Sequence, residues 1–335
     1  MDKRLQETLE AYVSNRDEIR RIYDSYGIPM HLMGATVLTA AGMKPDEERL
    51  LACQDMLRQK ESLDSPIRGI IKTITAVSMS MAEDPEGYYK NIKMAYDLIR
   101  VNRGGVIDER YYMAAYVMLG SVQGGPELLM MIDRAGAIHE AVGKSHNYFE
   151  DSEAYVMAAY AAAFGVTNAR EYAEKVEAYV EEFEKKIGMG QISEKMCMLL
   201  ALQSDRREQT VDRAMSIFEA LAAKDLHFRS DEEGGSVAVL AGLPLEPEKI
   251  AELVKQADDF LLECSGFVEK GPATVLRHVY AAALVSIAYA PRIQFKDRSL
   301  PEGIRNVIRS REALMQVQMV MHIQLTYVDI EDLHI

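Results

Sequence analysis

The chain has 335 residues, of which 48% are hydrophobic, and its formal net charge is −14. An acidic surface repels phosphate backbones and anionic headgroups, and no basic stripe interleaved with aromatic residues interrupts it. We therefore expect neither nucleic acid nor a membrane as a partner. A basic partner, a cation or a neutral ligand fits this charge better.

The N-terminus and the cysteines point to a cytoplasmic protein. Residues 1–21 are charged throughout and lack the apolar run of a signal peptide, and no stretch approaches the ~18 apolar residues of a membrane-spanning helix. The three cysteines lie far apart, each in an apolar helical pattern. An odd number of unclustered cysteines predicts a reducing compartment rather than a disulfide framework. They are Cys53, Cys197 and Cys264.

A first helix is predicted over 5–23, within an N-terminal capping segment of residues 1–27. From there the same order recurs: an apolar helix rich in small residues, a short loop, and a more charged amphipathic helix. A proline followed by an acid marks the start of the second helix, where proline and a negative charge are both favourable. The four such pairs are Pro45-Asp46, Pro85-Glu86, Pro126-Glu127 and Pro247-Glu248. The first three are evenly spaced, the fourth follows after three more such steps, and Thr167-Asn168 and Asp205 fill the two intermediate positions.

The apolar helix of each pair is rich in alanine, which lets helix axes approach closely, so these helices are expected to form a crowded inner layer. They are predicted over 33–41, 70–81, 111–119, 155–164, 196–202, 237–243 and 279–288. The charged helices carry one apolar stripe each and are expected to face solvent on the other side. The clearest stripe consists of Tyr172, Val176, Tyr179, Phe183 and Ile187. Residues 228–235 contain the run Asp-Glu-Glu-Gly-Gly and are interpreted as a loop with a solvated acidic turn.

A period of about 40 residues with two helices per unit is typical of a helical array. We predict an all-α chain of about seven helical hairpins in one domain over residues 1–335, arranged as an α-α solenoid. Residues 303–335 are predicted to form a C-terminal capping helix. The alternative is that the hairpins close into an α/α toroid.

Several packing and turn motifs resemble a bacterial family, the domain of unknown function 4003, over nearly the whole length. They are Ser65-Pro-Ile-Arg-Gly, the segment from Asn147 to Ala159, the segment from Phe218 to Leu226, Asp258-Asp-Phe-Leu-Leu and Val279-Tyr-Ala-Ala-Ala. The resemblance implies a bacterial, cytosolic, helical protein. It supplies no catalytic residues.

One candidate metal site is the acid-rich entry to the helix predicted at 155–164. His146, Glu150 and Asp151 lie close together in sequence, and carboxylates with an imidazole can bind a divalent cation. The alternative is an ordinary helix start, with Asp151 or Ser152 as the N-cap and Glu153 in the first turn.

Three arginines near the starts of inner helices are candidate ligand-binding residues: Arg68, Arg110 and Arg277. The alternative is that each one bridges an acid on the neighbouring unit. No phosphate-binding loop, nucleophile elbow or activated cysteine is recognisable, and we expect no cofactor.

Two functions remain open. The first is a non-enzymatic helical-repeat protein that binds a protein or peptide partner, which the repeat and the acidic charge favour. The second is an α/α-toroid enzyme, or a small-molecule-binding protein, with a central pocket. The sequence leaves enzymatic activity undecided and favours its absence. It does not indicate the oligomeric state.

Overall fold

The computed structural model describes residues 1–23, 28–62, 65–67, 69–108, 110–122, 125–145, 152–187, 194–204, 206–228, 233–264 and 272–289. Over these residues the chain forms fourteen α-helices and no strand, which confirms the all-helical prediction. None of these helices is long and apolar enough to cross a membrane. The arrangement of the hairpins as a solenoid or as a toroid stays a prediction, and the predicted C-terminal cap at 303–335 lies outside the described residues.

The first seven helices are α1 (Lys3–Ile22), α2 (Ile28–Ala41), α3 (Glu47–Lys60), α4 (Gly69–Met81), α5 (Pro85–Asn102), α6 (Arg110–Ser121) and α7 (Gly125–Ser145). The other seven are α8 (Ser152–Ala163), α9 (Ala169–Ile187), α10 (Glu194–Gln203), α11 (Arg207–Ala222), α12 (Gly234–Ala241), α13 (Pro247–Leu262) and α14 (Pro272–Tyr289).

The described chain divides into two compact units. We call residues 10–133 the first unit, and residues 1–9 together with 134–289 the second unit. In the first unit α4 packs on α2, α3 and α5, and α5 packs on α6. In the second unit α10 packs on α9 and α12, α11 packs on α12 and α13, and α14 packs on α12 and α13.

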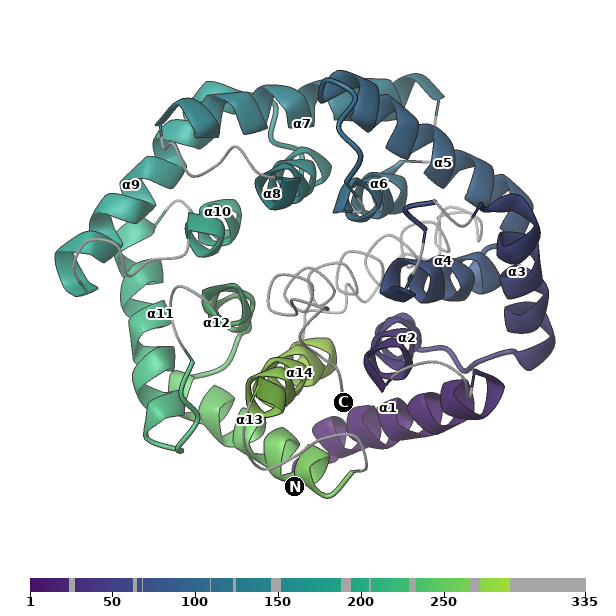
Figure 1. Ribbon diagram of the computed structural model, residues 1–335. Coiled ribbons are helices and arrows are strands. Elements are labelled where there is room, and N and C mark those ends of the chain that lie inside the picture. The colour runs from purple at the N-terminus through teal and green to yellow at the C-terminus, as the bar shows by residue number, and fades with distance from the viewer. Residues whose placement is uncertain are drawn as a thin grey trace, which may run out of the picture. The chain divides into compact units, whose positions relative to one another are not determined.

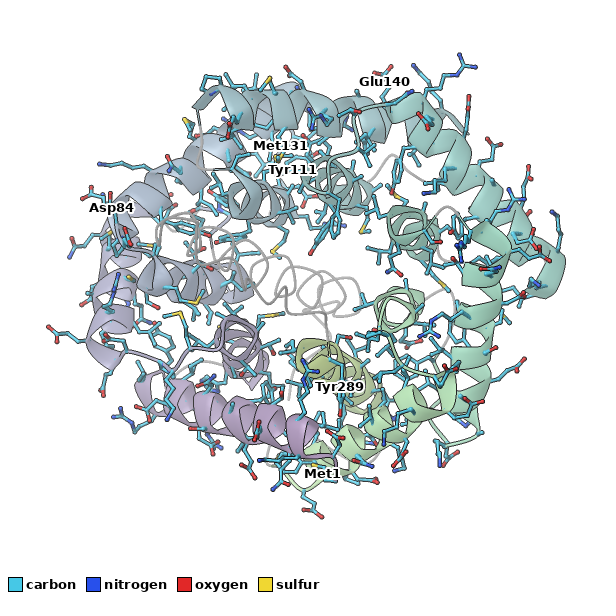
Figure 2. All side chains as sticks on the ribbon, turned by 180° about the vertical axis from the view of Figure 1, so that it is seen from behind. Met1, Asp84, Tyr111, Met131, Glu140 and Tyr289 are labelled. Atoms are coloured by element: carbon cyan, nitrogen blue, oxygen red, sulfur yellow. The ribbon has the colours of Figure 1, made fainter. Side chains whose placement is uncertain are left out.

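Within each unit the helices belong to two layers (Figure 1). The inner helices α2, α4, α6, α8, α10, α12 and α14 are buried on nearly every side, as expected for helices that are apolar all round. The outer helices α1, α3, α5, α7, α9, α11 and α13 bury one stripe each and expose the opposite face. In Figure 2 the labelled Asp84 and Glu140 side chains point away from the inner helices.

Capping residues explain where the outer helices begin. Asp46 accepts a hydrogen bond from the Arg49 backbone N–H at 3.0 Å, and Asp84 accepts one from the Gly87 N–H at 2.9 Å. Pro85 and Pro247 stand at the first helical turns of α5 and α13. All six predicted outer-helix starts lie within two residues of the observed ones.

The interpretation of residues 228–235 as a loop with a solvated acidic turn is wrong at its C-terminal end. Gly234 and Gly235 begin α12, and Glu233 is buried directly before them. Glycine adopts helical backbone angles as well as turn angles, so the Gly-Gly pair alone does not decide between a loop and a helix.

Three of the six pairs of consecutive outer helices are joined by ion pairs that share one sequence separation, |i−j| = 26, in the described part of the chain. In each pair, a cation at the last or second-last position of one helix contacts an acid on the first or second turn of the next outer helix. Lys60 Nζ lies 2.7 Å from Glu86 Oε1, and Lys186 Nζ lies 2.6 Å from Asp212 Oδ1. Arg21 pairs with Glu47 in the same way. We call these three contacts the outer-layer ion pairs.

Candidate functional site

The predicted site residues fall into two groups. Arg110 and Arg277 are described by the structure, whereas Arg68 and the proposed metal ligands His146, Glu150 and Asp151 lie outside the described residues. The metal site therefore stays a prediction. Among the residues that the structure does describe, no group of three His, Cys, Asp or Glu side chains could hold a metal ion.

Arg110 stands at the first position of α6 and interacts with an acid just before its helix. Asp108 Oδ1 accepts a hydrogen bond from the Arg110 backbone N–H at 2.8 Å and another from its Nε at 3.2 Å. The carboxylate thereby caps the start of α6 while it pairs with the guanidinium. The Arg110 side chain is still 42% exposed, so a ligand can reach it. A role in ligand binding stays a prediction for this residue.

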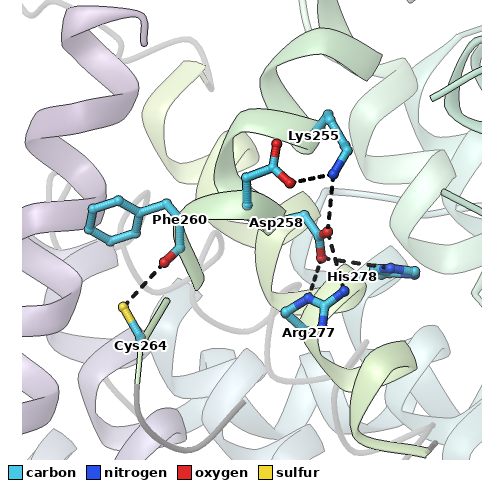
Figure 3. Close-up of polar contacts among 7 residues, drawn as sticks. Lys255, Asp258, Phe260, Cys264, Arg277 and His278 are labelled. Carbon is cyan, nitrogen blue, oxygen red and sulfur yellow. Dashed lines mark hydrogen bonds and ion pairs between the residues drawn. The ribbon is translucent and has the colours of Figure 1, made fainter. Parts of the chain in front are cut away.

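Arg277 lies in a buried polar cluster between α13 and α14 of the second unit (Figure 3). Its Nε donates to Asp258 Oδ1 at 2.5 Å and its Nη2 to Asp258 Oδ2 at 3.3 Å. The Arg277 side chain is 6% exposed and the Asp258 side chain 4%. This is the fork geometry in which guanidinium and carboxylate recognise each other best.

Two further basic side chains, a lysine and a histidine, lie near the same carboxylate. Lys255 Nζ lies 3.9 Å from Asp258 Oδ2 and also pairs with Asp259. His278 Nε2 lies 3.6 Å from Asp258 Oδ1. Burial lowers the pKa of His278; Asp258 opposes this shift, whereas Arg277 and Lys255 add to it. The imidazole is therefore neutral near pH 7.

The charges in the cluster balance, because two carboxylates face one guanidinium and one ammonium while the imidazole is neutral. The His278 ring also stacks on Phe228, with ring centroids 5.9 Å apart and an interplanar angle of 25°. The ion pair joins α13 to α14, and the ring contact joins Phe228, in the segment before α12, to α14. The guanidinium of Arg277 is already paired with the Asp258 carboxylate. Arg277 therefore bridges to an acid on a neighbouring helix, which was the alternative to ligand binding for the three arginines.

A second feature, in the first unit, is apolar surface that remains exposed. Of ten exposed large hydrophobic side chains among the described residues, eight lie in the first unit. They are Met43, Leu51, Met94, Val101, Val106, Ile107, Leu129 and Met130. The outer helices of the second unit expose mainly charged side chains, as Arg170 and Glu174 on α9 illustrate.

The exposed apolar residues are densest at the connection between α5 and α6. Val101 and Ile107 are both 70% exposed, and Val106 lies between them in sequence. The turn is well defined, because Gly104 and Gly105 adopt positive φ values of 72° and 84° and the Gly105 N–H donates to the Arg100 carbonyl at 2.8 Å. This left-handed helix ending requires glycine and fixes the direction of the chain that follows.

Helix α5 carries two apolar faces. One contains Tyr89, Ile92 and Ile99 and is buried against α4 and α6. The other contains Met94 and Val101, which are two helical turns apart and therefore on one side of the helix, and both are exposed. The sequence predicts one apolar stripe for each charged helix, so this second face was not predicted.

We call Val101, Val106, Ile107, Leu129 and Met130, together with the acid Glu127 at the start of α7, the α5–α7 surface.

The fold and its polar and apolar features define an all-helical protein of alternating buried and solvent-facing helices. The family model for a protein of unknown function, DUF4003, matches residues 22–313, and the chain belongs to that family. No curated protein and no solved structure matches the chain.

Proposed function

We propose that the protein is a non-enzymatic helical-hairpin repeat protein of the bacterial cytoplasm, and that it binds a protein or peptide partner. The observation that carries this proposal is the exposed apolar turn from Val101 to Ile107 on the outer layer of the first unit. Exposing such side chains in water has no benefit for folding, and grouped apolar residues mark binding surfaces.

Three other features support a polypeptide partner. The turn is held by glycine hydrogen bonds, so the apolar side chains are presented by a defined backbone. Met130 and Leu129, on the first turns of α7, extend the apolar character within the same unit. The net charge of −14 favours a partner that carries positive charge.

Site-specific photo-cross-linking tests this function. A photoreactive amino acid replaces Ile107 in cells that produce the protein, and a matched control carries it at Glu174, an exposed position of α9. We expect a discrete polypeptide adduct at position 107 that excess unmodified protein suppresses, and no such adduct at position 174. Equal adducts at both positions, or none at position 107, would contradict the proposal.

A further inference from the structure

The outer-layer ion pairs join three of the six pairs of consecutive outer helices in the described part of the chain. In three junctions a cation near the C-terminus of the first helix neutralises an acid near the N-terminus of the second, always at |i−j| = 26: α1 with α3, α3 with α5, and α9 with α11. The C-terminus of a helix favours a cation and the N-terminus an acid, so the pair suits both helix dipoles.

The junction between α5 and α7 has no such pair among the described residues. At the same separation before Glu127, the first-turn acid of α7, stands Val101 rather than Lys or Arg. Val101 is the second-last residue of α5, the position that Arg21 has in α1 and Lys186 in α9. Glu127 is exposed and makes no ion pair or hydrogen bond within the described part of the chain.

An exposed valine therefore stands at the position, 26 residues before a first-turn acid, that a cation takes in the outer-layer ion pairs. Met130 lies one helical turn after Glu127, and Val106 and Ile107 follow Val101 through the glycine turn. Two other junctions also lack a cation at this separation, since Ser145 precedes Glu171 on α9 and Ala222 precedes Glu248 on α13, but serine and alanine add little apolar surface there. The α5–α7 surface alone combines the missing cation with several large apolar side chains among the described junctions.

We infer that the α5–α7 surface binds a basic amphipathic segment of another protein, whose Lys or Arg pairs with Glu127 and whose apolar side chains cover Val101, Ile107 and Met130. This inference rests on the proposed function and specifies its partner. The partner cation takes the role that Arg21, Lys60 and Lys186 have in the outer-layer ion pairs. Two copies of this chain, each with a charge of −14, repel one another, which argues against self-association as the use of this surface.

The test uses a synthetic peptide of Leu and Lys at helical spacing and a second peptide with Glu in place of every Lys. Titration calorimetry compares the full-length wild type with three variants. Val101→Lys supplies the missing cation, and Glu127→Gln removes the acid. Ala222→Lys is the matched control, because it makes the same change in charge at the corresponding position of α11.

We expect the wild type to bind the Lys peptide and Val101→Lys to bind it about tenfold more weakly or worse. Glu127→Gln should weaken binding and reduce its dependence on salt, because one charge pair is lost. Ala222→Lys should bind like the wild type, and the Glu peptide should not bind. Val101 is exposed, so Val101→Lys should fold; circular dichroism checks this.

Equal losses in Val101→Lys and Ala222→Lys would show a general charge effect and overturn the inference. An unchanged affinity in Val101→Lys would overturn it too, as would concentration-dependent self-association of the wild type that Val101→Lys abolishes. Should the adduct at Ile107 form while Val101→Lys leaves peptide binding intact, the proposed function stands and this inference fails. If no adduct forms at position 107, both the proposed function and this inference fail.

Discussion

Lys60 Nζ lies 2.7 Å from Glu86 Oε1, which joins the last residue of α3 to the first turn of α5. The hydrogen bond from Lys60 is the main reason why the pKa of Glu86 is lowered. Arg21 with Glu47 and Lys186 with Asp212 repeat the contact at the same spacing. In α5, Val101 stands at the position that a cation has in these three junctions. A single exposed valine elsewhere on the surface would need no explanation.

The first prediction concerns Val101→Lys and stability. The introduced lysine should pair with Glu127, and a solvent-exposed pair of this kind contributes about 0.2–1 kcal/mol to the free energy of unfolding at low salt. Urea unfolding of Val101→Lys, Glu127→Gln and the double variant measures the coupling between the two sites. A coupling of zero at low salt would show that Val101 and Glu127 are not neighbours.

The second prediction concerns the packed stripe of α9. Tyr179 is fully buried and its hydroxyl donates to the Ser204 carbonyl at 3.0 Å. Tyr179→Ala should lower the free energy of unfolding by roughly 2–4 kcal/mol because it leaves a cavity. Tyr179→Phe keeps the ring and should cost only about 0.5–1.5 kcal/mol for the lost hydrogen bond. Similar small losses in both variants would mean that this face of α9 is not packed.

The third prediction concerns the buried ion pair. Asp258→Ala leaves the guanidinium of Arg277 buried without its carboxylate, which should cost about 3–5 kcal/mol. Asp259→Ala is the control, because Asp259 is the next residue, is exposed and also pairs with Lys255. The control should change stability by no more than about 0.5 kcal/mol. Equal effects in chemical denaturation would contradict the assignment of Asp258 as the buried partner.

The fourth prediction is a pH dependence that comes from His278. Burial lowers the pKa of this imidazole below its ordinary value of 6.5 in the folded state. As the pH falls through 6.5, the unfolded chain therefore binds the proton first, and the free energy of unfolding decreases. Above that pH the imidazole is neutral in both states and has no such effect.

His278→Gln removes this titration and serves as the comparison. Between about pH 7.5 and pH 6, where histidine is the side chain that titrates, the wild type should lose more stability than the variant. Parallel curves for the two proteins would show that the pKa of His278 is not lowered by folding.

The sequence predicted the helices well because their signals are local. Pro85 and Pro247 begin α5 and α13 where the proline–acid pairs indicate, and the stripe through Tyr179 is buried as its spacing predicts. The start of α12 was missed because the glycines Gly234 and Gly235 usually indicate a loop, whereas glycine can also adopt the helical backbone angles that it has here.

The site was harder to predict because its partners are distant in sequence. Arg277 was recognised, but its pairing with Asp258 depends on the way α13 packs against α14. One signal was present: Asp258 lies one helical turn after Val254 and one before Leu261, so the acid is on the apolar face of α13. An acid in that position predicts a buried cationic partner.

Hydrogen exchange of the protein, measured with and without the partner identified by cross-linking at Ile107, locates the binding surface. We predict slower amide exchange in residues 101–108 and 125–131 of the complex, with α9 and α11 unchanged. Slower exchange on α9 or α11, with the turn between α5 and α6 unaffected, would contradict the assignment of the α5–α7 surface as the binding site.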